Sequence, residues 1–202
     1  MLDRFAFALL APSLDRGAQV LAHRRVHADQ VTVTGFLLGA GGAAAIAQHA
    51  YLPGLALLLV SRVCDGLDGA LARRTRTTER GAFLDIALDF MFYAMVPLAF
   101  AITEPAANAL AAAVLLAAFV GTGSTFLAFA AVAAQRGIKN VAYPTKGIYY
   151  LGGLTEATET MVCFTAMCIW PEWFAGFAYM FAVLCALTIV TRLLAGWRDL
   201  PS

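Results

Sequence analysis

Apolar residues in this chain run in long stretches rather than in the short alternations of a soluble fold. A helix needs about 20 mostly apolar residues to cross a membrane. Six stretches have or approach this length, and we predict a helix in each. They cover residues 31–48, 52–73, 81–103, 106–134, 147–170 and 174–197. The pattern therefore predicts an all-α integral membrane protein with six transmembrane helices.

The N-terminal residues 1–27 have a different pattern, in which charged residues alternate with an apolar side that holds Phe5, Leu9 and Leu10. They lack a small-residue cleavage site, so we do not expect a removable signal peptide. We predict a juxtamembrane amphipathic helix that lies on the membrane and is broken near Pro12. No linker divides the chain, so residues 28–198 should form one six-helix bundle.

Composition agrees with a membrane protein. The 202 residues are 61% hydrophobic and 13% charged, whereas a soluble domain is about 45–50% apolar and about 25% charged. The net charge of +1 says nothing about nucleic acid, but the sequence has no basic run with interleaved aromatics, so we expect no nucleic-acid partner. The four cysteines lie in apolar stretches without a CxxC pair, as expected of small hydrophobic residues in membrane helices.

Lys and Arg residues mark one side of the predicted bundle. They gather in residues 16–25, 73–80, 136–146 and 192–198, and none lies in the loops near 49–53, 104–105 and 171–173. Cytoplasmic loops carry the Lys and Arg excess. We therefore expect both termini, and the helix ends beside them, on the cytoplasmic side.

Four aspartates interrupt two consecutive predicted helices. Asp65 and Asp68 are three residues apart and Asp85 and Asp89 four apart, so each pair shares one helix face. A short loop makes the two helices antiparallel neighbours, which puts both pairs at a similar depth. Crowded carboxylates need a cation to stay ionised. An all-oxygen set suits Mg²⁺, Mn²⁺ or Ca²⁺ rather than zinc, and Mg²⁺ often completes its shell with substrate phosphates.

The spacing also forms a recognisable string, Asp65-x-x-Asp68-Gly69-x-x-Ala72-Arg73, seven residues, then Gly81-x-x-x-Asp85-x-x-x-Asp89. It resembles the signature of the CDP-alcohol phosphotransferase (CDP-alcohol phosphatidyltransferase) family. All eight signature residues are present in order, and the gap before Gly81 is about one residue shorter than the usual form. Six helices with a cytoplasmic N-terminal arm also fit this family.

The resemblance implies a reaction and its residues. Asp65, Asp68 and Asp85 would hold one or two Mg²⁺ or Mn²⁺ ions on the diphosphate of a CDP-linked donor. Asp89 would complete the site and act as the base on the hydroxyl of a small alcohol acceptor, with release of CMP. The family makes phospholipids and is commonly homodimeric. Either the lipid or the alcohol could carry the CDP; a small chain of bacterial appearance favours CDP-diacylglycerol and the bacterial inner membrane.

A nucleotide site is implied as well, and its residues are Gly69, Ala72, Arg73, Gly81 and Thr32. Thr32 ends an Ala-Asp-x-x-Thr sequence at the place of a Pro-Asn-x-x-Thr element of the family, in which only the threonine matches.

The acceptor site is expected near Glu156 and Glu159, which are three residues apart, with Lys146 close by. Family members that use phosphorylated acceptors have arginines where this chain has Ala157 and Thr160. Since arginine is the preferred partner of a phosphate dianion, their absence predicts an unphosphorylated acceptor that could carry an amine. Lys146 keeps a phosphorylated acceptor open.

Three other interpretations compete. The aspartates could form a buried ion network with Arg62 and Arg73, and the glutamates could pair with Arg62, although four acids exceed what two arginines pair. An intramembrane prenyltransferase would carry a second aspartate cluster, and none follows Asp89. A divalent-cation transporter would carry polar residues through the whole membrane depth, but the far halves of residues 52–73 and 81–103 are apolar.

Overall fold

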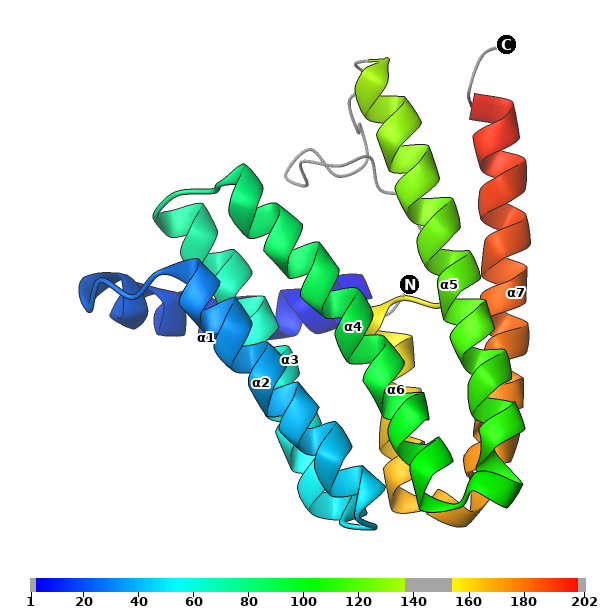
Figure 1. Ribbon diagram of the computed structural model, residues 1–202. Helices are drawn as coiled ribbons and strands as arrows, with labels where there is room; N and C mark the ends of the chain where they lie inside the picture. The colour runs from blue at the N-terminus through cyan, green and yellow to red at the C-terminus, as the bar shows by residue number, and fades with distance from the viewer. Residues whose placement is uncertain (1–2, 137–153, 200–202) are drawn as a thin grey trace.

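The computed structural model describes residues 3–136 and 154–199, and all regular elements within these ranges are helical (Figure 1). The prediction of an all-α fold is thereby confirmed. In chain order the elements are α1 (Asp3–His23), α2 (Ala28–Ala47), α3 (Tyr51–Arg74), α4 (Glu79–Thr103), α5 (Pro105–Gln135), α6 (Ala157–Ile169), the short 3₁₀ helix η1 (Pro171–Trp173) and α7 (Phe174–Asp199).

Helices α2, α3 and α4 form one packed group. α2 contacts both α3 and α4, and α1 crosses α3 at the end of the group where α3 finishes (Figure 1). Small residues let the backbones approach: a Cβ on Gly42 of α2 would lie 2.9 Å from the carbonyl oxygen of Gly54 on α3. Such close packing of small residues is the usual way in which membrane helices associate.

Helices α5 and α7 lie side by side along much of their length, and α4 joins them to the first group (Figure 1). Aromatic side chains fill the space between the groups. The rings of Phe100 on α4 and Phe174 at the start of α7 stack at 4.6 Å, and Phe164 of α6 lies against Phe119 of α5. One side of α6 thereby packs into the core, whereas Val162 on its other side is exposed.

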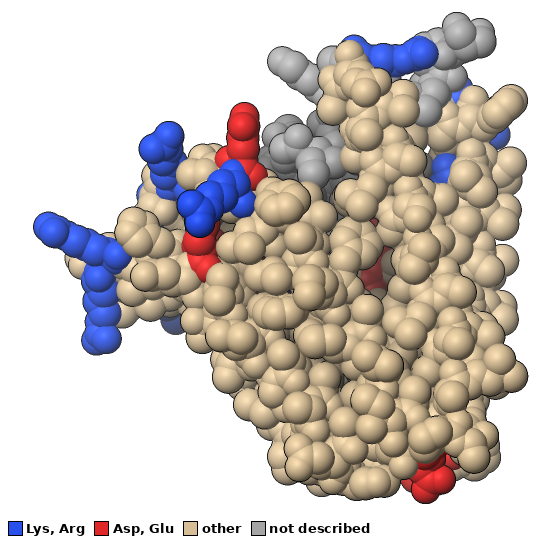
Figure 2. Space-filling view, viewed as in Figure 1, with Lys and Arg blue, Asp and Glu red and all other residues tan. Residues whose placement is uncertain are grey.

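The outside of the bundle is apolar. Phe83 of α4 is 73% exposed and Leu194 of α7 65% exposed, and Figure 2 shows a broad band of uncharged surface below the basic side chains. Among the described residues, four helical stretches are long and apolar enough to cross a membrane. They are α2, α4, α5 and the continuous stretch Pro171–Arg198. α3 is long enough but carries Arg62, Asp65 and Asp68, and α6 has only 13 residues.

Most basic residues of the described chain lie at one end of the bundle, where α3, α5 and α7 finish and α2 and α4 begin. Arg62, within α3, is an exception. Arg24, Arg74, Arg136 and Arg198 mark this end. Figure 2 shows blue side chains there with some acidic ones among them, whereas the opposite end shows acidic atoms without blue ones. The charge asymmetry predicted from the loops is therefore present in three dimensions.

Two expectations about local structure are wrong. α1 is not broken at Pro12, since the helix runs through it from Asp3 to His23. A proline inside a helix removes one backbone hydrogen bond, and here packing of the helix against α3 outweighs that loss: Leu14 of α1 lies against Gly66 of α3, and Leu67 lies against Gly17.

The fifth predicted helix is also shorter than expected. Residues 147–153 lie outside the described residues, but residues 154–156 are not helical and α6 begins at Ala157. Thr155 binds α7 instead, because its backbone N–H donates to Thr188 Oγ1 at 3.2 Å and the two hydroxyls are 2.9 Å apart. This contact with α7 lies two residues before the start of α6.

Candidate active site

One pocket opens between α2, α3 and α4, near the basic end of the bundle. All four predicted metal ligands line it, and so does the predicted nucleotide residue Thr32. Short side chains and a glycine leave room beside the carboxylates. The lining residues are Thr32, Gly35, Phe36, Ser61, Arg62, Asp65, Asp68, Asp85, Leu88 and Asp89.

Helix geometry gives the carboxylates their positions. Asp65 and Asp68 project from one face of α3, and Asp85 and Asp89 from the facing side of α4. The two pairs lie near the same end of the bundle, as the sequence indicated, but α3 and α4 are held beside the pocket mainly by α2, which packs against both. Asp68 is only 5% exposed, and its Oδ2 has no hydrogen-bond partner among the described residues. Such a buried, unpartnered carboxylate oxygen is costly unless it binds a ligand.

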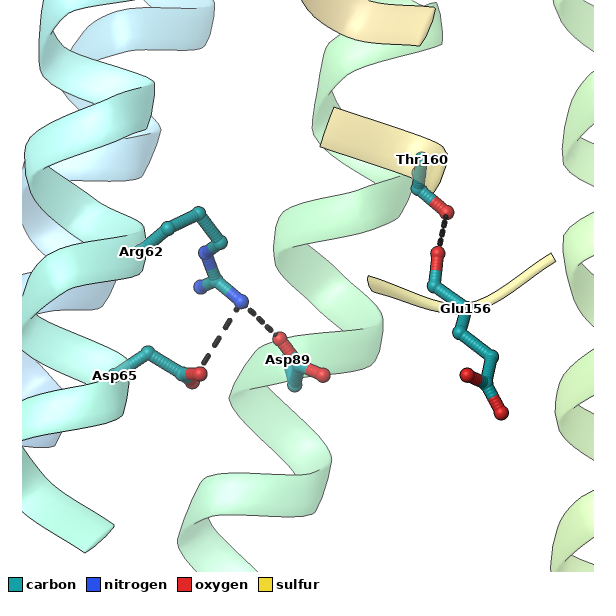
Figure 3. A network of polar contacts seen from close by, with 5 residues as sticks. All are labelled: Arg62, Asp65, Asp89, Glu156 and Thr160. Carbon is teal, nitrogen blue, oxygen red and sulfur yellow. Dashed lines mark hydrogen bonds and ion pairs between the residues drawn. The ribbon is translucent and has the colours of Figure 1, made fainter. Parts of the chain in front are cut away.

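Arg62 lies among these acids. Its Nη1 is 3.5 Å from Asp65 Oδ1 and donates a hydrogen bond to Asp89 Oδ1, so it connects α3 to α4 (Figure 3). The guanidinium carbon lies 3.8 Å from the centre of the Phe92 ring and 5.6 Å from that of Tyr93. The buried ion network considered in the sequence analysis is therefore present in part, as the contacts of Arg62 with Asp65 and Asp89. One arginine does not balance four aspartates, so the pocket retains an excess of negative charge.

The residues at the pocket suit a divalent cation by their chemistry. Carboxylate oxygens are the ligands that Mg²⁺ and Mn²⁺ prefer, and the Asp68 oxygen without a partner is available for one. Among the described residues, no three His, Cys, Asp or Glu side chains converge closely enough to form a coordination shell as they stand. Cation binding at this pocket would therefore require side-chain movement.

The other predicted nucleotide residues lie toward the helix ends rather than on the pocket wall. Arg73 folds back along α3, so that a Cβ on Gly69 would lie 3.2 Å from its Nη1. Gly81 is in the first turn of α4, and its N–H donates to the capping hydroxyl of Thr78 at 3.0 Å. A Cβ on Gly81 would lie 3.1 Å from Asp29 Oδ1 of α2. Both glycines thus permit close approach at the rim.

The predicted acceptor residues have a different arrangement from the one expected. Glu156 is the residue before α6 and has extended backbone angles, so it does not share a helical face with Glu159. Instead, the Glu159 carboxylate accepts a hydrogen bond from the Glu156 N–H at 3.2 Å, as in a capping box. In Figure 3 the Glu156 side chain points away from Arg62. Lys146 lies outside the described residues.

Sequence reasoning did not assign a site role to several residues of the pocket. Ser61 lies four residues before Asp65, and Gly35 three residues after Thr32, so helical spacing from the assigned residues would have found both. Phe92 and Tyr93, beneath Arg62, follow Asp89 by three and four residues. The same spacing rule would have pointed to them.

Comparison with known proteins identifies the family of the chain. The model of the family described as CDP-alcohol phosphatidyltransferase matches residues 25–191. The chain is 48% identical over 202 residues to the inner membrane protein YnjF of Escherichia coli K12, covering 100% of this chain and 98% of that protein. It is also 48% identical over 63 residues to archaetidylinositol phosphate synthase of Methanothermobacter thermautotrophicus, covering 31% and 32% of the two chains.

Two solved structures have a similar fold. Phosphatidylinositol phosphate synthase of Mycobacterium tuberculosis with CDP-DAG bound has a TM-score of 0.73 at 22% identity, covering 91% of this chain and 93% of that chain. The same enzyme in complex with manganese and citrate has a TM-score of 0.71 at 23% identity, covering 91% and 88%. At 22% and 23% sequence identity, these similarities show that the fold is shared.

Proposed function

Because the chain belongs to the CDP-alcohol phosphatidyltransferase family, whose members are transferases, we propose that it transfers the phosphatidyl group of CDP-diacylglycerol to the hydroxyl of a small alcohol and releases CMP. The observation that carries this proposal is the convergence of Asp65, Asp68, Asp85 and Asp89 with Thr32 on one pocket. CDP-DAG in the similarly folded mycobacterial enzyme supports the choice of donor.

The aspartates divide the work. Asp65, Asp68 and Asp85 would hold Mg²⁺ or Mn²⁺, which supplies positive charge to the diphosphate when bound. Asp89 would take the proton of the acceptor hydroxyl. The hydroxyl oxygen then forms a bond to the phosphorus that carries the diacylglycerol, and the bond from that phosphorus to the oxygen of CMP breaks. Manganese in the mycobacterial structure supports the metal assignment.

Residues at the pocket rim would bind the nucleotide. Thr32 already lines the pocket, while Gly69 and Gly81 leave space near it for a ligand to approach the backbone. Arg73, which folds back beside Gly69, would lie near phosphate, and Ala72 adds little bulk to the same turn of α3.

For the acceptor we propose an unphosphorylated alcohol. Ala157 and Thr160 stand where arginines would bind a phosphate, and the Thr160 hydroxyl donates to the carbonyl oxygen of Glu156 at 2.8 Å (Figure 3). The capping arrangement weakens the case for Glu156 and Glu159 as direct acceptor ligands. The inositol phosphate lipids named for two similar enzymes make inositol phosphate the main competing acceptor.

We further propose that the protein lies in a bacterial inner membrane as a homodimer with six spans. α3 and the helical segment containing α6 would complete the four apolar stretches. α1 would lie along the membrane surface, since Leu9 and Leu10 are exposed. The basic end, with the pocket and both termini, would face the cytoplasm.

CMP release by purified enzyme tests the reaction. We expect CMP from CDP-diacylglycerol only when Mg²⁺ or Mn²⁺ and an alcohol are both present. A panel of alcohols with and without a phosphate identifies the acceptor, and turnover with phosphorylated alcohols alone would contradict the acceptor proposal. No CMP from either CDP-diacylglycerol or a CDP-linked alcohol would contradict the reaction itself.

A further inference from the structure

The Arg62 side chain is largely buried and lies against an aromatic ring of the neighbouring helix α4. The residue lies one turn before Asp65 on α3 with its side chain 16% exposed. Phe92, fully buried, lies beneath the guanidinium at 3.8 Å, where the ring face attracts a cation. Gly39 of α2 makes room for that ring, because a Cβ there would lie 2.5 Å from Phe92 Cδ2. Three helices therefore fix the guanidinium.

The guanidinium contacts two of the four aspartates, one on each of the helices α3 and α4. A single nitrogen, Nη1, reaches both Asp65 Oδ1 and Asp89 Oδ1. Nε of Arg62 and the hydroxyls of Ser61 and Tyr93, all buried nearby, have no hydrogen-bond partner in the described part of the chain. The surroundings are thus not arranged to satisfy Arg62 fully. One nitrogen, Nη1, faces both carboxylates: it donates a hydrogen bond to Asp89 and forms an ion pair with Asp65.

A divalent cation held by Asp65, Asp68 and Asp85 would share one carboxylate with Arg62, that of Asp65, whose Oδ1 lies 3.5 Å from Arg62 Nη1. Two positive charges at a few ångströms repel one another strongly in a buried site, so the fixed arginine opposes cation binding at Asp65 and Asp89. At the same time, a charge-assisted hydrogen bond fixes the direction of the carboxylate that accepts it. Asp89 is the residue for which direction matters, because a base must face the hydroxyl whose proton it takes.

We infer that Arg62 is a positioning residue, which holds the Asp89 carboxylate toward the acceptor and, as a resident positive charge, weakens the binding of a divalent cation by the four aspartates. The inference rests on the proposed function. It assigns Arg62 no contact with substrate, and it differs from a packing role because the charge, rather than the bulk, of the side chain does the work.

Manganese binding in the absence of substrate tests the charge. Free Mn²⁺ would be measured by electron paramagnetic resonance during titration of the purified protein. We expect Arg62→Gln to bind Mn²⁺ about tenfold more tightly than the unchanged protein, because the repulsion is lost. Arg62→Met, which keeps an apolar stem against Phe92, should behave alike and serves if the glutamine variant does not fold.

The matched control is Arg74→Gln. It removes the same charge from the same helix, but Arg74 pairs with Asp15 of α1 at 3.7 Å, outside the pocket. Its affinity for Mn²⁺ should stay within about twofold of the unchanged protein, since a screened surface charge acts weakly. An equal gain in both variants would overturn the inference, because it would reflect net charge alone.

Kinetics test the positioning. Arg62→Gln should lower kcat by about 10- to 100-fold, as misplaced catalytic groups do, while KM for CDP-diacylglycerol stays nearly constant. Arg62→Lys should recover most of kcat and the original Mn²⁺ affinity, since one nitrogen suffices for both contacts. Unchanged or weaker Mn²⁺ binding in Arg62→Gln, or a lysine variant as impaired as glutamine, would overturn the inference. If the unchanged protein neither bound Mn²⁺ nor released CMP, the proposed function itself would fail.

Discussion

The two halves of the bundle bury polar side chains in different ways. Around α5, α6 and α7, buried hydroxyls bind each other or a nearby carbonyl group, as Thr155 and Thr188 do, and the Arg192 guanidinium donates to the Thr122 carbonyl at 3.1 Å. Around α2, α3 and α4, four buried polar atoms near the acidic pocket have no such partner among the described residues: Ser61 Oγ, Arg62 Nε, Asp68 Oδ2 and Tyr93 OH. In the second half the same holds for one atom, Nε of Arg192, whose guanidinium is nonetheless bound to Thr122.

We interpret this difference as a division of roles: the half with α2, α3 and α4 serves function, and the half with α5, α6 and α7 serves stability. A buried polar group with a partner contributes modestly to stability, whereas one without a partner costs free energy. A fold keeps that cost where a ligand or a reaction uses the group. The first half should therefore respond to substitution mainly in activity and metal binding, and the second half mainly in stability.

The largest expected effect belongs to Asp89. Asp89→Asn should lower CMP release by at least about 100-fold, because an amide cannot take the acceptor proton, while the protein stays folded. Steady-state CMP release together with a thermal melt checks both. The control is Glu79→Gln, an exposed change in the same helix, which should leave activity intact. Near-normal turnover in Asp89→Asn would remove it from the proposed reaction.

Asp68 should show opposite effects on metal binding and stability. Asp68→Asn should weaken Mn²⁺ binding by more than about tenfold and should raise the melting temperature in buffer with a chelator. The reason is that a neutral amide is cheaper to bury beside three other acids than a carboxylate. Asp15→Asn, at the exposed ion pair with Arg74, is the control for charge and should change neither. A less stable Asp68→Asn protein would show that this carboxylate serves the fold.

A substitution at Gly39 tests whether the close packing of α2 against Phe92, the ring beneath Arg62, is required. Gly39→Ala should destabilise the protein by about 1–3 kcal/mol, since its Cβ would lie 2.5 Å from Phe92, and should also reduce turnover through Arg62. Gly41→Ala on the same helix meets only Leu57 at 3.8 Å and should be neutral. Thermal melts and CMP release of the two variants provide the comparison; equal behaviour would mean that α2 can shift freely.

The smallest effect is expected in the second half. Thr188→Val should lower the free energy of unfolding by about 1–2 kcal/mol, because the Thr155 N–H loses its side-chain acceptor, with little change in turnover. Thr191→Val, an exposed hydroxyl bonded to Thr188 O within its own helix, should stay within about 0.5 kcal/mol. A large loss of activity in Thr188→Val, without loss of stability, would break the division between the halves.

Much of this organisation is present in the sequence, because membrane helices are specified locally. Their backbone groups must bond within the helix and their outer faces must be apolar. The bounds predicted for α2, α3, α4, α5 and α7 accordingly differ by at most three residues at each end from those in the structure. The meeting of Asp65 and Asp68 with Asp85 and Asp89 also follows from helical spacing and one short loop, and the family resemblance that they carry is confirmed.

Tertiary contacts decided what local pattern could not. Just before the start of α6, Thr155 binds Thr188, 33 residues away. α1 continues through Pro12 and packs against Gly66 and Leu67 of α3. The setting of Arg62 needs Phe92 from α4 and Gly39 from α2. Composition and spacing determined the helices and the four acids, because both are properties of a single segment. The arrangement around those acids was decided by the tertiary structure, because it depends on side chains that only packing brings together.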